Sequence, residues 1–284
     1  MRVDSRWSRM ILFKYTVSAM HSQPPTQNNA ASLGEPLPAH VEAALWRGGE
    51  LRPPPAWVRP SGWAALDAEL PGGGWPCRCI TELLVPQPGV LEWRLLTPAL
   101  RPLAERGGDI VVVAPPRQPF LGGLVQDGLD PDRFLRIQVH EPARRLWVTE
   151  QLLKANASDV VISWLPQVRQ EQLRRLQTCA TGFEGLCFLV RPIGSLRDSS
   201  AAPLRVAAAL GADWNLDVRI AKRRGPVHEN TLALQAIPGG LAGVLTPELM
   251  RPSQLDPATL PFIEVPYVVG GSATPSRTRQ ASTH

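Results

Sequence analysis

Patterns typical of buried strands alternate with helical patterns through the middle of the chain. Continuous apolar, β-branched runs occur in "DIVVVAPP" (109–116), "SDVVISWLP" (158–166) and "EGLCFLVRP" (184–192). Such runs are typical of strands buried on both faces of a parallel sheet. Amphipathic helical patterns separate them, in "EWRLLTPALRPLAERGG" (92–108), "EPARRLWVTEQLLKANA" (141–157) and "VRQEQLRRLQTCATGF" (168–183). This alternation predicts an α/β fold with a mainly parallel central sheet.

The two ends of this core have other patterns. The stretch "SGWAALDAELPGGGWP" (61–76) predicts a short helix capped by Ser61 and stopped by Pro71 and three glycines, and "CRCITELLV" (77–85) predicts a strand after it. Near the other end, "WNLDVRIAKRRGPVHENTLALQAIPGG" (214–240) contains two alternating runs around Gly225 and Pro226. This pattern predicts an antiparallel hairpin that extends one edge of the sheet.

Prolines divide the chain into three parts. The 284 residues include 30 prolines, which crowd the first sixty residues and the stretch after Pro238. We therefore expect a Pro-rich N-terminal segment at 1–60, a folded core at 61–240 and a partly disordered Pro/Ser/Thr-rich tail at 241–284. The N-terminal segment contains one short helical pattern, "VEAALWRGGEL" (41–51), whose Trp46 is expected to dock on the core or on a neighbouring molecule. Residues 1–19 precede Met20, which offers a second start codon, and are interpreted as a start-site extension.

Charge and cysteine content narrow the function classes. The formal net charge is +5 and the isoelectric point is near 9.4, values compatible with nucleic acid or with an acidic protein surface. No apolar run approaches the roughly 20 residues of a membrane span. The four cysteines, Cys77, Cys79, Cys179 and Cys187, lack paired metal spacing, which indicates a reducing cytoplasm and no disulfide framework. We expect neither a metal site nor a membrane partner.

The turn "VPQPGVLEW" (85–93) lies where a strand is followed by a helix, as a phosphate-binding loop does. Such a loop needs successive backbone N–H groups, a lysine and a Ser/Thr hydroxyl. Here two prolines have no N–H to donate, Val90 and Leu91 stand about where the lysine and the hydroxyl belong, and Glu92 adds a negative charge. We therefore predict a vestigial loop without a nucleotide cofactor, made of Pro86, Gln87, Pro88, Gly89, Val90 and Leu91.

The order of these elements resembles the RecA core, and "SGWAALDAELPGGGWPCRCITELL" (61–84) resembles the opening of the ImuA family, accessory proteins of bacterial translesion mutagenesis that are grouped with the SulA division inhibitors. In a RecA-type ATPase the second strand ends in a catalytic carboxylate and the third in a metal-binding aspartate. Here those strands end in "VVVAPPRQP" (111–119) and "DVVISWLP" (159–166), which offer Arg117, Ser163 and Trp164. The resemblance thus implies a RecA fold without a working ATP site. The alternative is that Arg117 substitutes as a phosphate ligand.

Basic side chains gather in two places. One set lies on the predicted helix 168–183 and the other on the predicted hairpin, and they comprise Arg174, Arg175, Arg219, Lys222, Arg223 and Arg224. We name them as candidate contacts for nucleic acid or a protein partner, the ordinary alternative being a solvated face. The stretch "RPIGSLRDSSAAP" (191–203), which corresponds to a DNA-binding loop of RecA, is short and pairs arginines with Asp198. DNA contact is therefore expected to be indirect.

The resemblance implies a bacterial cytoplasmic adaptor of the SOS response. Its implied partners are a Y-family-like polymerase (ImuB), an error-prone C-family polymerase and RecA. Two alternatives remain open: a SulA-like inhibitor of cell division that binds FtsZ, and an atypical ATPase.

Overall fold

The computed structural model of the chain describes residues 57–254. Contacts divide the chain into two units, Met1–Leu45 and Trp46–His284, and the first unit lies wholly outside the described residues. The predictions for residues 1–19, for the docking of Trp46 and for the end of the C-terminal tail also fall outside that range. The three-part division of the chain therefore stays a prediction.

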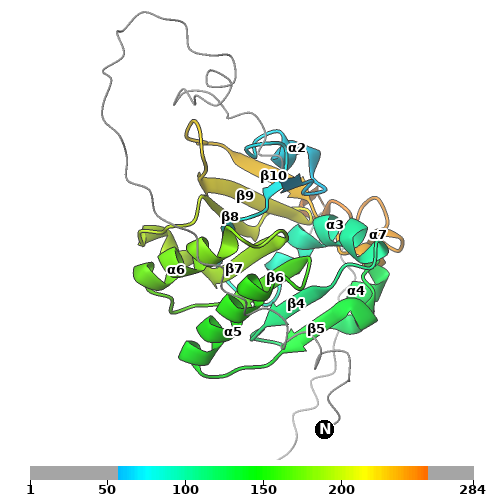
Figure 1. Cartoon of the computed structure of the whole chain (residues 1–284). Helices are drawn as coiled ribbons and strands as arrows, with labels where there is room; N and C mark the ends of the chain where they lie inside the picture. The colour runs from blue at the N-terminus through cyan, green and yellow to red at the C-terminus, as the bar shows by residue number, and fades with distance from the viewer. Residues whose placement is uncertain (1–56, 255–284) are drawn as a thin grey trace, which may run out of the picture. The chain divides into compact units, whose positions relative to one another are not determined.

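An eight-stranded mixed sheet forms the centre of the described part (Figure 1). Its strand order is β10-β9-β8-β3-β7-β6-β4-β5, and the strands from β8 to β5 are mutually parallel, whereas β8, β9 and β10 pair antiparallel. This arrangement confirms the predicted α/β class, the mainly parallel sheet and the edge hairpin. The strands are β3 (Ile80–Val85), β4 (Ile110–Val113), β5 (Phe134–Ile137), β6 (Val160–Trp164), β7 (Leu186–Pro192), β8 (Leu204–Leu210), β9 (Asn215–Lys222) and β10 (Thr231–Gln235).

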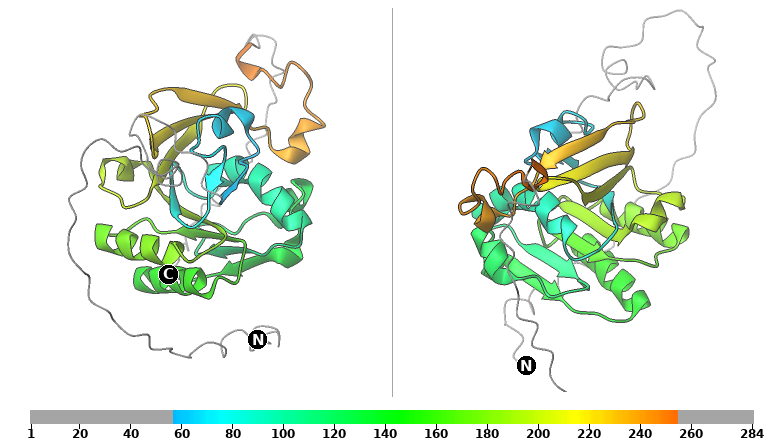
Figure 2. Two further views of the ribbon diagram at one scale, coloured as in Figure 1. Left: turned by 45° about the horizontal axis from the view of Figure 1, so that its top comes forward. Right: turned by 180° about the vertical axis from the view of Figure 1, so that it is seen from behind.

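Strand β8 is an element that the sequence pattern did not predict. Its sequence, "LRVAAAL", contains three alanines, which favour helix over strand. In the structure β8 pairs on one side with β3 and on the other with β9, and its first five residues are buried. Pairing with two neighbours thus overrides the local preference of the alanines. Figure 2 shows β8 and the β9–β10 hairpin at the end of the sheet remote from β5.

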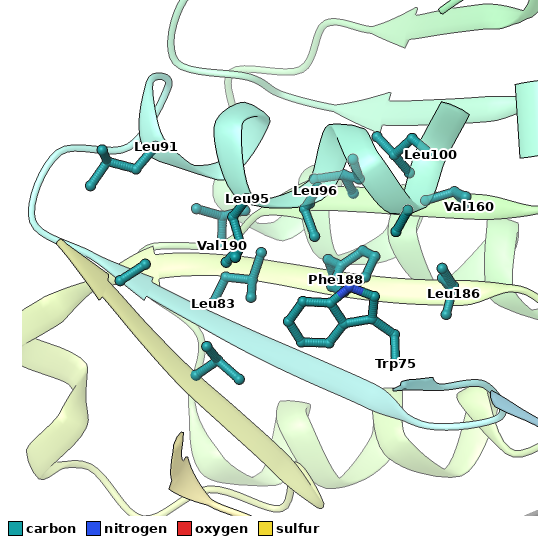
Figure 3. Packing of buried hydrophobic residues seen from close by; sticks show 14 of the residues in the cluster. Trp75, Leu83, Leu91, Leu95, Leu96, Leu100, Val160, Leu186, Phe188 and Val190 are labelled. Atoms are coloured by element: carbon teal, nitrogen blue, oxygen red, sulfur yellow. The ribbon is translucent and has the colours of Figure 1, made fainter. Parts of the chain in front are cut away.

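Helices cover both faces of the sheet. They are α2 (Ala64–Asp67), α3 (Leu91–Glu105), α4 (Leu121–Gln126), α5 (Pro142–Ala155), α6 (Gln170–Ala180) and α7 (Gly239–Ala242), with 3-10 turns η1 (Pro131–Arg133), η2 (Ile193–Arg197) and η3 (Pro252–Gln254) and a small separate sheet of β1 (Val58–Arg59) and β2 (Trp75–Pro76). The apolar side of α3 packs on one face of the sheet. On this face the rings of Trp75 and Phe188 meet edge to face, with their centroids 5.3 Å apart (Figure 3). Helices α5 and α6 pack on the other face around Phe183 and Leu189.

The start of the core differs in detail from the prediction. Helix α2 is shorter than expected, and Ser61 does not bond to its backbone N–H groups. Instead the Ser61 hydroxyl accepts from the N–H of Trp63 at 3.1 Å, and the Ser61 N–H donates to the Asp67 carboxylate at 2.8 Å. Pro98 lies inside α3 and packs against Gly62, where an added Cβ would meet Pro98 Cβ at 2.4 Å. Gly62 is thus required for α2 to approach α3.

A buried charge cluster ties the two central strands to the strand that the sequence missed. The carboxylate of Glu82 on β3 is fully buried and accepts from Arg191 of β7 at 2.7 Å and from Arg205 of β8 at 2.6 Å. Arg191 also bonds to Asp198 at 3.1 Å, and Arg205 donates to the carbonyl of Ser195 at 2.6 Å. The cluster therefore fixes both the order of β7, β3 and β8 and the position of η2.

Replacing Glu82 with glutamine should destabilise the fold strongly. The substitution keeps the size of the side chain but leaves the buried Arg205 without a counter-charge and Arg191 with only the more exposed Asp198, so we expect the free energy of unfolding to fall by about 3–5 kcal/mol. Chemical denaturation measures this change. The matched control is Glu184→Gln, which breaks a more exposed pair with Arg78 at 3.3 Å and should cost about 0–1 kcal/mol. If the two substitutions lowered the free energy of unfolding equally, the Glu82 cluster would not be stabilising the strand order.

Candidate functional site

The turn at 86–90 joins the end of β3 to the start of α3, as the sequence predicts. Gly89 adopts a φ of +99°, a conformation that favours glycine. A Cβ at this position would also meet Pro116 Cγ at 3.1 Å, so the loop lies against the segment that follows β4. The turn is therefore held in place on one side by the segment after β4, a strand that is not adjacent to β3 in the sheet.

The carboxylate of Glu92 lies in the turn and accepts from its backbone. Glu92 Oε1 accepts from the N–H of Gly89 at 2.5 Å, and Oε2 accepts from the N–H of Val90 at 3.1 Å. The side chain belongs to the first turn of α3 and is only 1% exposed. A negative group at a helix N-terminus is favoured by the orphan N–H groups and the helix dipole. A carboxylate of the chain itself thus takes the place that an anionic ligand of such a loop would occupy.

Aromatic side chains close this site from the side of β6. The indole Nε1 of Trp164, the last residue of β6, donates to Glu92 Oε1 at 2.6 Å. Trp164 lies against Trp93 with ring centroids 5.9 Å apart, and Trp93 lies against Phe134 of β5 at 5.6 Å. The Glu92 carboxylate is therefore buried and held by three donors, the two turn N–H groups and the Trp164 indole, and Trp164 itself packs against a row of aromatic rings.

The structure brings together the loop at 86–90, Trp164 and Arg117, which the sequence singled out separately. The loop, Glu92 and Trp164 are in direct contact, and the exposed Arg117 lies beside Gly89, with its Cγ 3.8 Å from where a Cβ of that glycine would be. Ser163 lies apart, since its hydroxyl shares a buried 2.8 Å hydrogen bond with Thr149 of α5. The bond between Glu92 and Trp164 was not foreseen. An acidic residue in the first turn of the helix was its one sequence signal.

The candidate basic residues differ in what they contact. On α6, Arg175 pairs with Glu150 of α5 at 2.7 Å, whereas Arg174 is exposed. Glu150 also accepts from Lys154 at 2.6 Å, and this hydrogen bond, with the nearby charges of Arg175 and Lys154, lowers the pKa of Glu150. The ion pair of Arg175 with Glu150 thus links α6 to α5.

On the hairpin, two of the four candidate residues are held by the fold. Arg223 is largely buried, donates to the Glu69 backbone carbonyl and bonds to its carboxylate at 3.0 Å. Lys222 donates to the carbonyl of Ser200 at 2.8 Å, and partial burial lowers its pKa. Arg219 and Arg224 are exposed, and Arg224 lines a small pocket with Gln177 of α6. The role of these residues in partner contact stays a prediction.

The cysteine thiols are poor nucleophiles where they lie. Burial raises the pKa of Cys79 to about 12, and burial likewise raises the pKa of Cys77, Cys179 and Cys187. These thiols are therefore protonated at neutral pH. Within residues 57–254, no three His, Cys, Asp or Glu side chains are grouped as a metal site would need, and no helix is both long and apolar enough to cross a membrane.

Comparison with known proteins gives a partial match. No family model matches the chain. It is similar to the cell division inhibitor SulA of Photorhabdus laumondii subsp. laumondii, with 26% identity over 112 residues that make up 39% of this chain and 63% of that protein. It is also similar to the cell division inhibitor SulA of Serratia marcescens, with 26% identity over 106 residues, 37% of this chain and 62% of that protein. The chain thus spans less than two thirds of the length of these relatives.

Removing the Glu92 carboxylate should open an anion site. In a Glu92→Ala variant the buried Trp164 indole is left unpaired at a cost of about 1–3 kcal/mol, and the lost hydrogen bonds of Gly89 and Val90, which lie in a partly exposed turn that water can reach, add about 1 kcal/mol. We expect the free energy of unfolding to fall by about 2–4 kcal/mol, and inorganic phosphate to raise the melting temperature of the variant more than that of the wild type, because phosphate can accept from the same donors.

The matched control is Glu105→Ala, at the exposed end of the same helix. It should unfold like the wild type and gain no more from phosphate than the wild type does. If phosphate stabilised Glu92→Ala and Glu105→Ala equally, the Glu92 carboxylate would not be filling an anion site.

Proposed function

We propose that this chain is a RecA-like protein of the bacterial SOS response that has no catalytic activity and works by binding other proteins. The similarity to two SulA proteins supports the link to this response and to the SulA-like group. The resemblance of residues 61–84 to the opening of the ImuA family supports a place among the accessory proteins of translesion synthesis.

One observation supports the proposed absence of catalysis: the Glu92 carboxylate binds the backbone of the loop in which a nucleotide phosphate would have to lie. ATP would have to place negatively charged phosphates where a buried carboxylate already accepts from Gly89, Val90 and Trp164. A phosphate there would lie against a carboxylate of the same sign, and the two negative charges would repel each other. The loop also contains Pro86 and Pro88, which supply no N–H, and Trp164 stands where the resemblance to RecA would require a metal-binding aspartate. A protein built in this way presents its surfaces without a nucleotide switch.

The first form of the proposal is an adaptor that links a Y-family-like polymerase (ImuB) with an error-prone C-family polymerase, with RecA as a further partner. The length of the chain supports this form. An alignment of 112 residues is 63% of the first SulA but only 39% of this chain, so this chain is considerably longer. An adaptor can use the additional length to bind a second partner.

The second candidate is an inhibitor of cell division that binds FtsZ. The observation in its favour is that both curated relatives carry that activity in their names. Binding measurements with purified ImuB-type polymerase, C-family polymerase, RecA and FtsZ separate the two forms. We expect the full chain to retain the polymerase and to leave FtsZ assembly unchanged. Inhibition of FtsZ assembly without polymerase binding would establish the second candidate in place of the first, and binding to none of them would overturn both.

Calorimetry with ATP and Mg²⁺ tests the loss of nucleotide binding. Because the Glu92 carboxylate occupies the loop, we expect no binding tighter than about 1 mM. The full wild-type chain is the sample, and Glu105→Ala is the charge control on the same helix. Micromolar affinity for ATP in the wild type would favour the atypical ATPase instead.

A further inference from the structure

A cavity of about 560 Å³ lies on the opposite side of the sheet from α3, at the starts of α5 and α6. Its wall comes from His140 in the connection after β5, the first turns of α5 from Pro142, the connection of residues 165–169 between β6 and α6, and Gln172 in the first turn of α6. Figure 1 shows α5 and α6 side by side along the same face of the sheet. The cavity is therefore built on two packed helices and two parallel strands.

Basic side chains from three of these segments line this cavity. They are His140, Arg145 and Arg169, and no aspartate or glutamate is among the lining residues. Arg145 is half-buried and its Nε donates to the carbonyl of Val139 at 2.9 Å, so its guanidinium is held in position. His140 and Arg169 are exposed and hence accessible. The charge of this lining favours a carboxylate or another anionic group.

The remainder of the lining is mostly apolar. Of eleven lining residues six are apolar, namely Pro142, Ala143, Leu146, Leu165, Pro166 and Val168. Trp147 lies one helical turn beyond Ala143 on the same side of α5 and is 57% exposed. A nucleic-acid backbone would be bound by charge alone, whereas a peptide with acidic and apolar side chains uses both kinds of wall.

We propose that this cavity is a binding site for an acidic and apolar peptide segment of a protein partner. The carboxylates of the segment pair with Arg145 and Arg169, and an apolar side chain lies against Leu146 and Leu165. The inference rests on the proposed function in that the ligand belongs to a protein, but it names a surface that the sequence did not predict, although Arg169 belongs to the basic helix 168–183 that the sequence did single out. It is also independent of the loop at 86–90, because the two sites share no residue.

Selection from a display library of random peptides on the full chain tests the site. We expect the enriched peptides to combine Asp or Glu with Leu, Ile, Phe or Trp. The affinity of the best peptide, measured by fluorescence anisotropy, should fall at least about tenfold in Arg169→Glu, equivalent to about 1.4 kcal/mol. His140→Glu is a second exposed substitution in the lining and should weaken binding in the same direction.

The matched control is Arg174→Glu, which reverses an exposed charge on the same helix outside the cavity and should change the affinity less than twofold. Enriched peptides without an excess of acidic residues, or equal weakening by Arg169→Glu and Arg174→Glu, would overturn the proposal. Displacement of the peptide by a single-stranded oligonucleotide, with the oligonucleotide also lost in Arg169→Glu, would assign the cavity to nucleic acid instead.

Partner-binding measurements on the Arg169→Glu variant distinguish a failure of the proposed cavity from a failure of the proposed function. If the polymerase or FtsZ binds the wild type and the Arg169→Glu variant equally well, the cavity is not the partner site, although the proposed function stands. If neither protein binds while acidic peptides still depend on Arg169, the cavity is a peptide site and the named partners are wrong.

Discussion

The pairing of the Glu92 carboxylate with the turn between β3 and α3 is the interaction on which the functional interpretation depends. A parallel strand followed by a helix leaves backbone N–H groups at the turn, and these groups need an acceptor. In this chain the acceptor is covalently part of the helix itself. An internal carboxylate pays no association entropy, so an external phosphate would have to displace a partner that is always present.

The arrangement of the central strands also relies on buried charge. Glu82 lies between Arg191 and Arg205, and the carbonyls of η2 take up further guanidinium donors. Such clusters add little net stability relative to apolar packing, but an incomplete cluster is very unfavourable. Strands β7, β3 and β8 therefore have one favourable order. The same cluster buries Arg191, which removes one of the basic groups of the loop at 191–203 from the surface.

Other contacts within the chain determine which basic side chains remain available to partners. Arg175, Lys222 and Arg223 are engaged in contacts within the chain, and of these three only Arg223 is largely buried, whereas Arg174, Arg219 and Arg224 are all exposed. The basic lining of the cavity at the starts of α5 and α6 comes from other residues, His140, Arg145 and Arg169. Charge counted along the sequence thus did not reveal where accessible basic groups meet an apolar wall. That depends on the packing of α5 against α6.

The sequence alone determined the α/β class, the strands β3, β4, β6 and β7, the main helices and the edge hairpin, because continuous apolar runs and helical periodicity are local properties. It also placed the turn at 86–90 between a strand and a helix. Only the tertiary structure decided that the alanine-rich stretch 204–210 is a strand, because pairing on both sides outweighs its preference for helix. Likewise, only the fold could show that Glu92 and Trp164, 72 residues apart, share a hydrogen bond. Contacts between distant residues depend on strand order, which local patterns do not encode.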